Sequence, residues 1–291
     1  MRSTLRYTSL DILTLQEVAI HVLTTSNVEQ KALDTIYYVN SWQNGIINEI
    51  THTNLTVTCP NEPNKPVSND QMKPLALLNP EDEILEMKKL KTMYKKNTIE
   101  CTIHAIANAE SYAVDLFWDL IARYTTTNAD KLPLDFYNDM TYIAKQEAEH
   151  FLSWYRRLQE LEYPFGTFPL SKGLWQSAGD TADNLLARLA IINMTHEAKG
   201  LDTYAYTLEK FNKANDTISI DILNHNFTEE VYHVATGLKW FKYICSILQR
   251  EPILEFQTLS KLYFKGKLKP PFNVSARDKA GLTEEWYMPL T

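Results

Sequence analysis

Two Glu-x-x-His motifs constrain the fold of this chain more than any other feature of its sequence. They are Glu147-Ala-Glu-His150 and Glu230-Val-Tyr-His233, and each stands in a long stretch whose apolar residues recur at helical spacing. Residues three apart lie on one face of a helix, so each motif presents a carboxylate and an imidazole side by side. The two motifs therefore predict two helices that carry the same pair of metal-binding side chains.

Two isolated glutamates complete the pattern, because Glu110 and Glu197 stand in two further helical stretches. The chain runs 37 residues from Glu110 to Glu147 and 33 residues from Glu197 to Glu230, which suits two pairs of helices joined by short loops. The 50 residues from Glu147 to Glu197 leave room for a long crossover. A Glu from each of two helices with a Glu-x-x-His from each of the other two is the inward ligand set of ferritin-like dimetal proteins. The sequence therefore predicts an all-α, ferritin-like four-helix bundle.

The predicted ligands form one set of carboxylates and imidazoles. They are Glu110, Glu147, His150, Glu197, Glu230 and His233. A lone glutamate is usually a surface residue and a lone histidine usually a structural one, but six at matched places favour a shared site. Uncompensated carboxylates on apolar helix faces would be costly, whereas coordination neutralises them. Oxygen and imidazole ligands suit iron or manganese, so we expect two iron ions, and a manganese or mixed manganese–iron pair fits the same set.

Several neighbours of these ligands have predicted roles of their own. Gln146 and Glu229 each directly precede the glutamate of a motif, and we expect them to hold the free ring N–H groups of the histidines. Gly200 and Gly237 lie one and two turns past Glu197 and Glu230, where they leave space for oxygen or a substrate or else permit close helix packing. Four more candidates lie off the ligand face and are expected to be structural: His104, His196, His225 and Glu149.

Four long helical segments carry the ligands. They are expected over residues 97–124, 133–161, 180–213 and 217–248. Pro133 is well placed as a first-turn proline of the second segment. The stretch 163–179, which is rich in aromatic residues, Pro and Gly, is expected to be a loop.

The rest of the chain is expected to wrap around this core as one domain. The predicted organisation is a single domain over 1–291, with a bundle core at 97–248, an N-terminal part at 1–96 and a C-terminal segment at 249–291. The N-terminal part contains two short helices between about residues 9 and 47, which break near Ser26-Asn27, and a Pro-rich strap over 51–80. The C-terminal segment is expected to form a short helix over 255–264 and then a strand-like coil ending at Trp286-Tyr287.

Charge and cysteine content limit the partners of this chain. The formal net charge of -7 provides no global positive field for nucleic acid. The lysines from Lys88 to Lys96 follow a run of acidic residues, so they complement a helix dipole or, as the alternative, contact phosphates. Three cysteines without a C-x-x-C spacing and a start unlike a signal peptide predict a reduced, cytoplasmic protein. No apolar run is long enough to predict a membrane span.

Several longer motifs resemble a known family. They are His104-Ala-Ile-Ala, Glu147-Ala-Glu-His150-Phe, Gly173-Leu-Trp175, Asp183-Asn-Leu-Leu-Ala-Arg-Leu-Ala190, Glu197-Ala-Lys-Gly-Leu-Asp202, Glu230-Val-Tyr-His233-Val-Ala, Leu268-Lys-Pro-Pro-Phe272 and Glu285-Trp-Tyr287. Together they are similar to the ferritin-like family catalogued as domain of unknown function 455. The resemblance implies the same six metal ligands, and none is missing. Gln146 and Asn108 depart from it, because they stand where a carboxylate and a histidine are expected in relatives.

The sequence leads to one preferred function and two alternatives. We expect an oxygen-activating oxidoreductase, a hydroxylase, oxygenase or desaturase, whose partners are molecular oxygen, a small organic substrate and an electron donor. Iron storage or detoxification is the first alternative, disfavoured because long extensions outside the bundle would obstruct cage assembly. A tRNA-modifying hydroxylase is the second, suggested by fold analogy and disfavoured by the acidic net charge.

Overall fold

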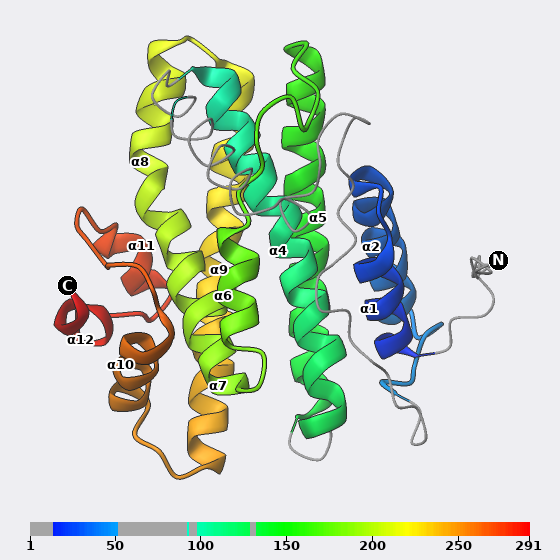
Figure 1. The fold of residues 1–291 in the computed structure, drawn as a ribbon, viewed down its shortest axis with the longest axis vertical. Coiled ribbons are helices and arrows are strands. Elements are labelled where there is room, and N and C mark those ends of the chain that lie inside the picture. Colours follow the sequence, from blue (N-terminus) through cyan, green and yellow to red (C-terminus); the bar gives the residue numbers. More distant parts are fainter. Residues whose placement is uncertain (1–13, 52–91, 93–97, 129–131) are drawn as a thin grey trace, which may run out of the picture. The chain divides into compact units, whose positions relative to one another are not determined.

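The computed structural model describes residues 14–51, 92, 98–128 and 132–291 (Figure 1). Regular secondary structure in these residues is helical, apart from one isolated bridge between Thr14 and Glu49. The predicted all-α class is confirmed. The Pro-rich strap and the lysines from Lys88 to Lys96 lie outside the described residues. No helix in the described part of the chain is long and apolar enough to cross a membrane.

The described residues form two compact units. The first contains α1 (Leu15–Thr24), α2 (Val28–Gln43) and the stretch Val114–Ala148. The second contains residues 98–113 and Glu149–Thr291. Helices α4 (Ile99–Asn128) and α5 (Leu134–Glu160) contribute to both units, since the division falls within each of them. The prediction of a single domain stays a prediction.

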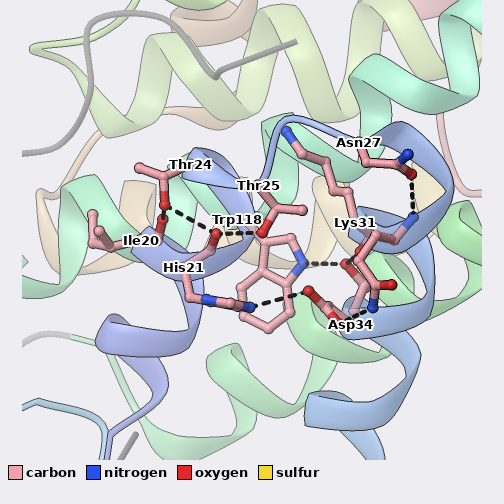
Figure 2. A network of polar contacts seen from close by, with 10 residues as sticks. Ile20, His21, Thr24, Thr25, Asn27, Lys31, Asp34 and Trp118 are labelled. Carbon is pink, nitrogen blue, oxygen red and sulfur yellow. Dashed lines mark hydrogen bonds and ion pairs between the residues drawn. The ribbon is translucent and has the colours of Figure 1, made fainter. Parts of the chain in front are cut away.

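Local capping explains why two helices form at the start of the first unit. Thr14 and Glu17 make a capping box at the start of α1, and the Asn27 side chain accepts the Gln30 N–H at the start of α2. Figure 2 shows this pair of helices, in which His21 Nε2 of α1 lies 3.0 Å from Asp34 Oδ2 of α2. The predicted break near Ser26-Asn27 is therefore confirmed.

A buried ion pair joins α2 to α4 within the first unit. Lys31 Nζ lies 2.6 Å from Asp115 Oδ1, and both side chains are almost fully buried. One turn further along α2, the Thr35 hydroxyl accepts the indole N–H of Trp118 at 3.0 Å. These contacts fix the register of α2 against α4, because the four side chains are buried from water.

Helices α8 (Glu197–Lys213) and α9 (Thr217–Ile247) form a hairpin in the second unit (Figure 1). The turn ends at Asp216, whose carboxylate accepts the Ser219 N–H and so caps α9. Arg157, from the part of α5 that belongs to this unit, donates to the same Asp216 at 2.9 Å. Lys210 of α8 donates to the hydroxyl of Thr102 of α4.

The segment before α8 is a wide helical turn rather than a regular α-helix. The chain passes from α7 (Leu185–Arg188) into a π-helix, η2 (Leu189–His196), and then into α8 without a break. Thr195 Oγ1 donates to the carbonyl of Ala190, five residues back, at 2.8 Å. π-Helical segments within α-helices are rare and frequently lie at functional sites, and this one ends immediately before Glu197.

Two predicted stretches of irregular structure contain helices instead. Helix α6 (Gly173–Asp180) lies in the expected loop 163–179, and the expected helix over 180–213 is interrupted at 181–184. Beyond α10 (Pro252–Tyr263), the expected strand-like coil contains α11 (Val274–Lys279), α12 (Glu284–Tyr287) and a 3₁₀ turn, Met288–Leu290. Arg277 holds this end, because its guanidinium pairs with Asp202 of α8 at 2.6 Å and lies 4.4 Å from the Tyr287 ring centroid. The sequence lacked a local periodic signal for such short helices, which depend on these long-range contacts.

Candidate metal centre

All six predicted ligands lie on long helices. Glu110 is on α4, Glu147 and His150 are on α5, Glu197 is the first residue of α8, and Glu230 and His233 are on α9. Five of them belong to the second unit. Glu147 stands two residues before the part of α5 that belongs to that unit, on the same uninterrupted helix as His150.

The ligand atoms of these residues gather in two overlapping groups. The first is Glu110, Glu147, His150 and Glu230, and the second is Glu147, Glu197, Glu230 and His233. Within each group, one ligand atom from each residue lies within 4.8 Å of all the others. Glu147 and Glu230 belong to both groups, whereas each group has one further glutamate and one histidine of its own. The two groups therefore share two carboxylates, and each is compatible with binding a metal ion.

The Nδ1 atoms of the two histidines lie at or beyond the limit of hydrogen bonding from the nearby ligand carboxylates. His150 Nδ1 lies 3.5 Å from Glu230 Oε1 and 3.9 Å from Glu110 Oε2, and His233 Nδ1 lies 3.6 Å from Glu230 Oε2. Two neighbouring donors that each bind a cation at about 2.1 Å are themselves separated by roughly 3–4 Å. The observed separations therefore fit donors that converge on a cation.

Burial differs between the inner and outer edges of the cluster. Glu147, His150 and His233 are each only 1% exposed, whereas the side chains of Glu110 and Glu230 keep 12% and 15% of their surface. Several carboxylates so close together in a buried place repel one another, and cations would offset that repulsion. Four carboxylates and two imidazoles also match the hard and borderline donors that iron and manganese prefer. By donor chemistry, spacing and burial, these residues fit a pair of such ions.

The two residues predicted to hold the histidines differ in what they contact. Glu229 Oε2 lies 2.7 Å from His150 Nε2, on the side of the ring opposite to the nitrogen that faces the cluster. Gln146 is buried on α5 directly before Glu147. Its role stays a prediction.

The two glycines near the site serve different purposes. A Cβ added to Gly237 on α9 would lie 2.3 Å from the carbonyl oxygen of Asn193 in η2, so the two backbones touch there. A Cβ added to Gly200 on α8 would meet only Glu230 Oε2, at 3.9 Å. Gly237 is therefore a close-packing residue, whereas a side chain at the exposed Gly200 would only come into van der Waals contact with Glu230.

Residues that the sequence set aside as structural lie in contacts of their own. His104 accepts the Gly166 N–H at 2.9 Å and stacks on Phe165, and burial lowers the pKa of His104 to about 4. Asn108, where a histidine was expected in relatives, donates to the Ser171 carbonyl at 3.1 Å, so both side chains hold the loop after α5. His196 Nε2 lies 3.0 Å from the Ser177 hydroxyl, and burial lowers its pKa to about 4.

The π-helix is the feature of the site that the sequence analysis missed. It places Asn193 against Gly237 and sets the register at which Glu197 begins α8. The sequence contained one indication of this contact, because Gly237, one turn beyond His233, is the kind of residue that allows a close backbone approach.

Comparison with known proteins supports the resemblance noted in the sequence. The family described as "Protein of unknown function (DUF455)" matches residues 24–288, so the predicted family is confirmed. An uncharacterized protein of Haemophilus influenzae (strain ATCC 51907 / DSM 11121 / KW20 / Rd) is 30% identical over 185 residues, which cover 63% of this chain and 64% of that protein. The matched stretch thus spans just under two thirds of that relative. No solved structure matches the chain.

Proposed function

The chain belongs to the DUF455 family, whose description assigns no reaction, and we propose from its site that it is a dimetal carboxylate protein. The observation that carries the proposal is the pair of overlapping ligand groups that share Glu147 and Glu230. One cation would be held by Glu110 and His150 and the other by Glu197 and His233, with the two shared carboxylates bridging them. We expect iron at both positions, since this donor set is the one used in ferritin-like dimetal proteins.

The same proposal includes the ferritin-like arrangement of helices. Contacts inside the second unit support it, because α8 pairs with α9, Arg157 of α5 reaches the start of α9, and Thr102 of α4 meets Lys210 of α8. The long connection between α5 and η2 corresponds to the crossover that such bundles contain. Each of the four helices then supplies its ligands from one face.

We further propose that the chain is an oxygen-activating oxidoreductase acting on a small organic substrate, with an electron donor as a second partner. A bound iron pair supplies the redox capacity to reduce oxygen, which side chains of this kind lack. The protein's part is to hold the ligands and to limit water on the inner side. Phe151 and Val234 directly follow the two histidines and are buried, so apolar side chains flank the ligands along α5 and α9. In the described part of the chain, the exposed Gly200 and the partly exposed Glu230 lie on the side of the cluster from which we expect a small molecule to approach.

Metal analysis of anaerobically purified protein tests the proposal. Expression with iron should yield about two irons per chain, and added oxygen should oxidise them. Glu147→Gln keeps the shape of a shared ligand but removes its charge, so most of the iron should be lost. Glu149→Gln is the matched control, because Glu149 is exposed two residues further along the same helix. Wild-type protein without stoichiometric metal, or equal metal in both variants, would refute the proposed site.

The reaction is tested separately from the metal. The iron-loaded protein should consume oxygen when a reductant is present, and a substrate should remain unchanged under strictly anaerobic conditions. Turnover without oxygen would exclude oxygen activation. Accumulation of many irons per chain in a large hollow assembly would instead indicate the storage function.

A further inference from the structure

Asn193 of η2 lies one turn from the candidate metal centre, within the second unit. It stands four residues before Glu197, and Gly237 stands four residues after His233 on α9. Glu197 and His233 meet in the second ligand group, whereas a Cβ added to Gly237 would lie 2.3 Å from the Asn193 carbonyl oxygen and 2.9 Å from its Cβ. Asn193 and Glu197 therefore both face α9, and the contact between Asn193 and Gly237 lies roughly 5–6 Å along the helix from the ligands.

The Asn193 side chain is buried without a partner for its carbonyl oxygen. It keeps 2% of its surface exposed, and Oδ1 has no hydrogen bond within the described part of the chain. Asn226, a second buried asparagine on α9, has the opposite character. In the amide orientation that satisfies both of its polar atoms, it donates to the Ile222 carbonyl at 3.1 Å and accepts the Trp154 indole N–H at 2.9 Å. Buried polar atoms are normally paired, so the Asn193 oxygen requires an explanation such as a bound polar group.

Three unfavourable features coincide at this level of α9 and η2. A π-helix is a rare conformation, a glycine inside a helix is destabilising, and a buried carbonyl oxygen without a partner is costly. Departures of this kind from ordinary packing are expected at functional sites, where binding rather than stability determines the residue. Their position one turn from two metal ligands indicates a ligand-binding role.

We propose that the Asn193 carboxamide is a substrate-binding residue that accepts a hydrogen bond from a hydroxyl or N–H group at the inner end of the molecule. This inference rests on the proposed function and names its substrate class. The class is a small organic molecule with a donor at one end and an apolar body, since apolar side chains flank the ligands along α5 and α9.

The order of residues along the helix gives this hydrogen bond a purpose. Gly200 and Asn193 stand on opposite sides of Glu197 in one continuous helix, so a molecule that approaches beside Gly200 reaches Asn193 last. A donor held by Asn193 leaves the atoms roughly 5–6 Å behind it level with the metal ligands. Asn193 would thereby select which carbon of the molecule lies at the metal pair.

Two isomeric probes test the hydrogen bond without any assay of turnover. Hexanol and methyl pentyl ether have the same composition and similar shape, but only hexanol has a donor. Their affinities are measured by calorimetry on the iron-loaded, full-length protein kept free of oxygen. Wild-type protein should bind hexanol about 3–10-fold more tightly than the ether, as expected for one hydrogen bond to a buried acceptor.

Two asparagine variants separate binding from a structural role. Asn193→Leu keeps the approximate shape and should abolish the preference for hexanol. Its metal-free form should melt no lower than the wild type, because the change removes an unpaired polar atom. Asn226→Leu is the matched control, which should melt lower because Trp154 and Ile222 lose their partner, and it should retain the preference. The iron content of Asn193→Leu should equal that of the wild type.

The outcomes distinguish this inference from the proposed function. Equal affinity of wild-type protein for the two isomers, no binding of either, or an Asn193→Leu variant that keeps the preference would overturn the role of Asn193 and leave the dimetal site standing. A lower melting temperature or a loss of iron in Asn193→Leu would show a structural residue and overturn it as well. Wild-type protein without iron would refute the dimetal proposal, and with it the placing of a substrate at a metal pair, whatever the preference for hexanol.

Discussion

Replacing two glycines by alanine should change the stability of this protein in opposite directions. At Gly237, the new Cβ would lie 2.3 Å from the Asn193 carbonyl oxygen and 2.8 Å from its carbon. Ordinary contact begins near 3.4 Å, so α9 and η2 must separate by about 1 Å at this crossing. At Gly200, the nearest atom to the new Cβ is Glu230 Oε2 at 3.9 Å, so nothing has to move.

The magnitudes follow from two opposing effects. Alanine is better than glycine in a helix by about 0.8–1.0 kcal/mol, and this gain applies at both positions. Overpacking costs about 1–3 kcal/mol and more where backbone, which cannot rotate away, is the obstacle. We therefore expect Gly237→Ala to lose about 2 kcal/mol of unfolding free energy and Gly200→Ala to gain up to about 1 kcal/mol.

Thermal unfolding of metal-free protein, followed by circular dichroism, measures both effects. At about 2–4 °C per kcal/mol for a chain of this class, Gly237→Ala should melt roughly 4–8 °C below the wild type and Gly200→Ala slightly above it. Metal content gives a second readout, because Asn193 stands one turn before Glu197 in the same continuous helix. Gly237→Ala should lose iron and Gly200→Ala should retain it. A Gly237→Ala variant as stable as the wild type would refute the backbone contact between α9 and η2.

Three further predictions concern a buried ion pair, a neutral histidine and the metal itself. Lys31→Met should lower the free energy of unfolding by about 3–5 kcal/mol in urea titrations, because Asp115 would stay buried beside an apolar side chain, and a second change, Asp115→Leu, should recover much of that loss. Burial lowers the pKa of His104 from 6.5 to about 4 in the folded protein. As the pH falls, the unfolded chain therefore takes up a proton first, which favours unfolding. The stability that neutral His104 contributes is complete above about pH 6.5 and is lost towards pH 4, by up to about 3 kcal/mol. His104→Gln, which does not titrate, should show a shallower decline over that window, and an unchanged decline would contradict the assignment. Adding Fe²⁺ without oxygen at about 100 times its dissociation constant should add about 2.7 kcal/mol of stability per bound ion to the wild type and much less to Glu147→Gln, as judged by melting temperature.

The long helices of this fold could be predicted from the sequence because their signals are local. Apolar periodicity located α4, α5 and α9 to within a few residues, and it located the end of α8 but not the turn at 181–184 or the change of helix type before α8. The caps Asn27 and Asp216 lie where the first two short helices and the α8–α9 hairpin turn. The short helices α6, α11 and α12 were missed for the converse reason. Helices of so few residues are not stable alone, and contacts such as Arg277 with Asp202 hold them in place.

The candidate site, like the fold, could be predicted from the sequence only where its signals are local. Residue chemistry and helical spacing were enough to nominate six ligands, because a Glu-x-x-His pair shares one face of any helix that contains it. Its metal, substrate and reaction stay predictions. The sequence could not decide between space and close packing at Gly200 and Gly237, since that depends on which backbone lies opposite each glycine.

What the sequence by itself determined, then, is the helical class, the positions of the long helices and the ligand types that their faces present. Only the tertiary structure decided the π-turn that precedes Glu197, the backbone contact at Gly237, and the pairing of Glu229 with one ring nitrogen of His150. The physical reason is that periodicity and side-chain chemistry act within one helix, whereas helix separation and ring orientation depend on atoms distant in the sequence. Those distances are set when the elements pack, and no single helix contains the information that specifies them.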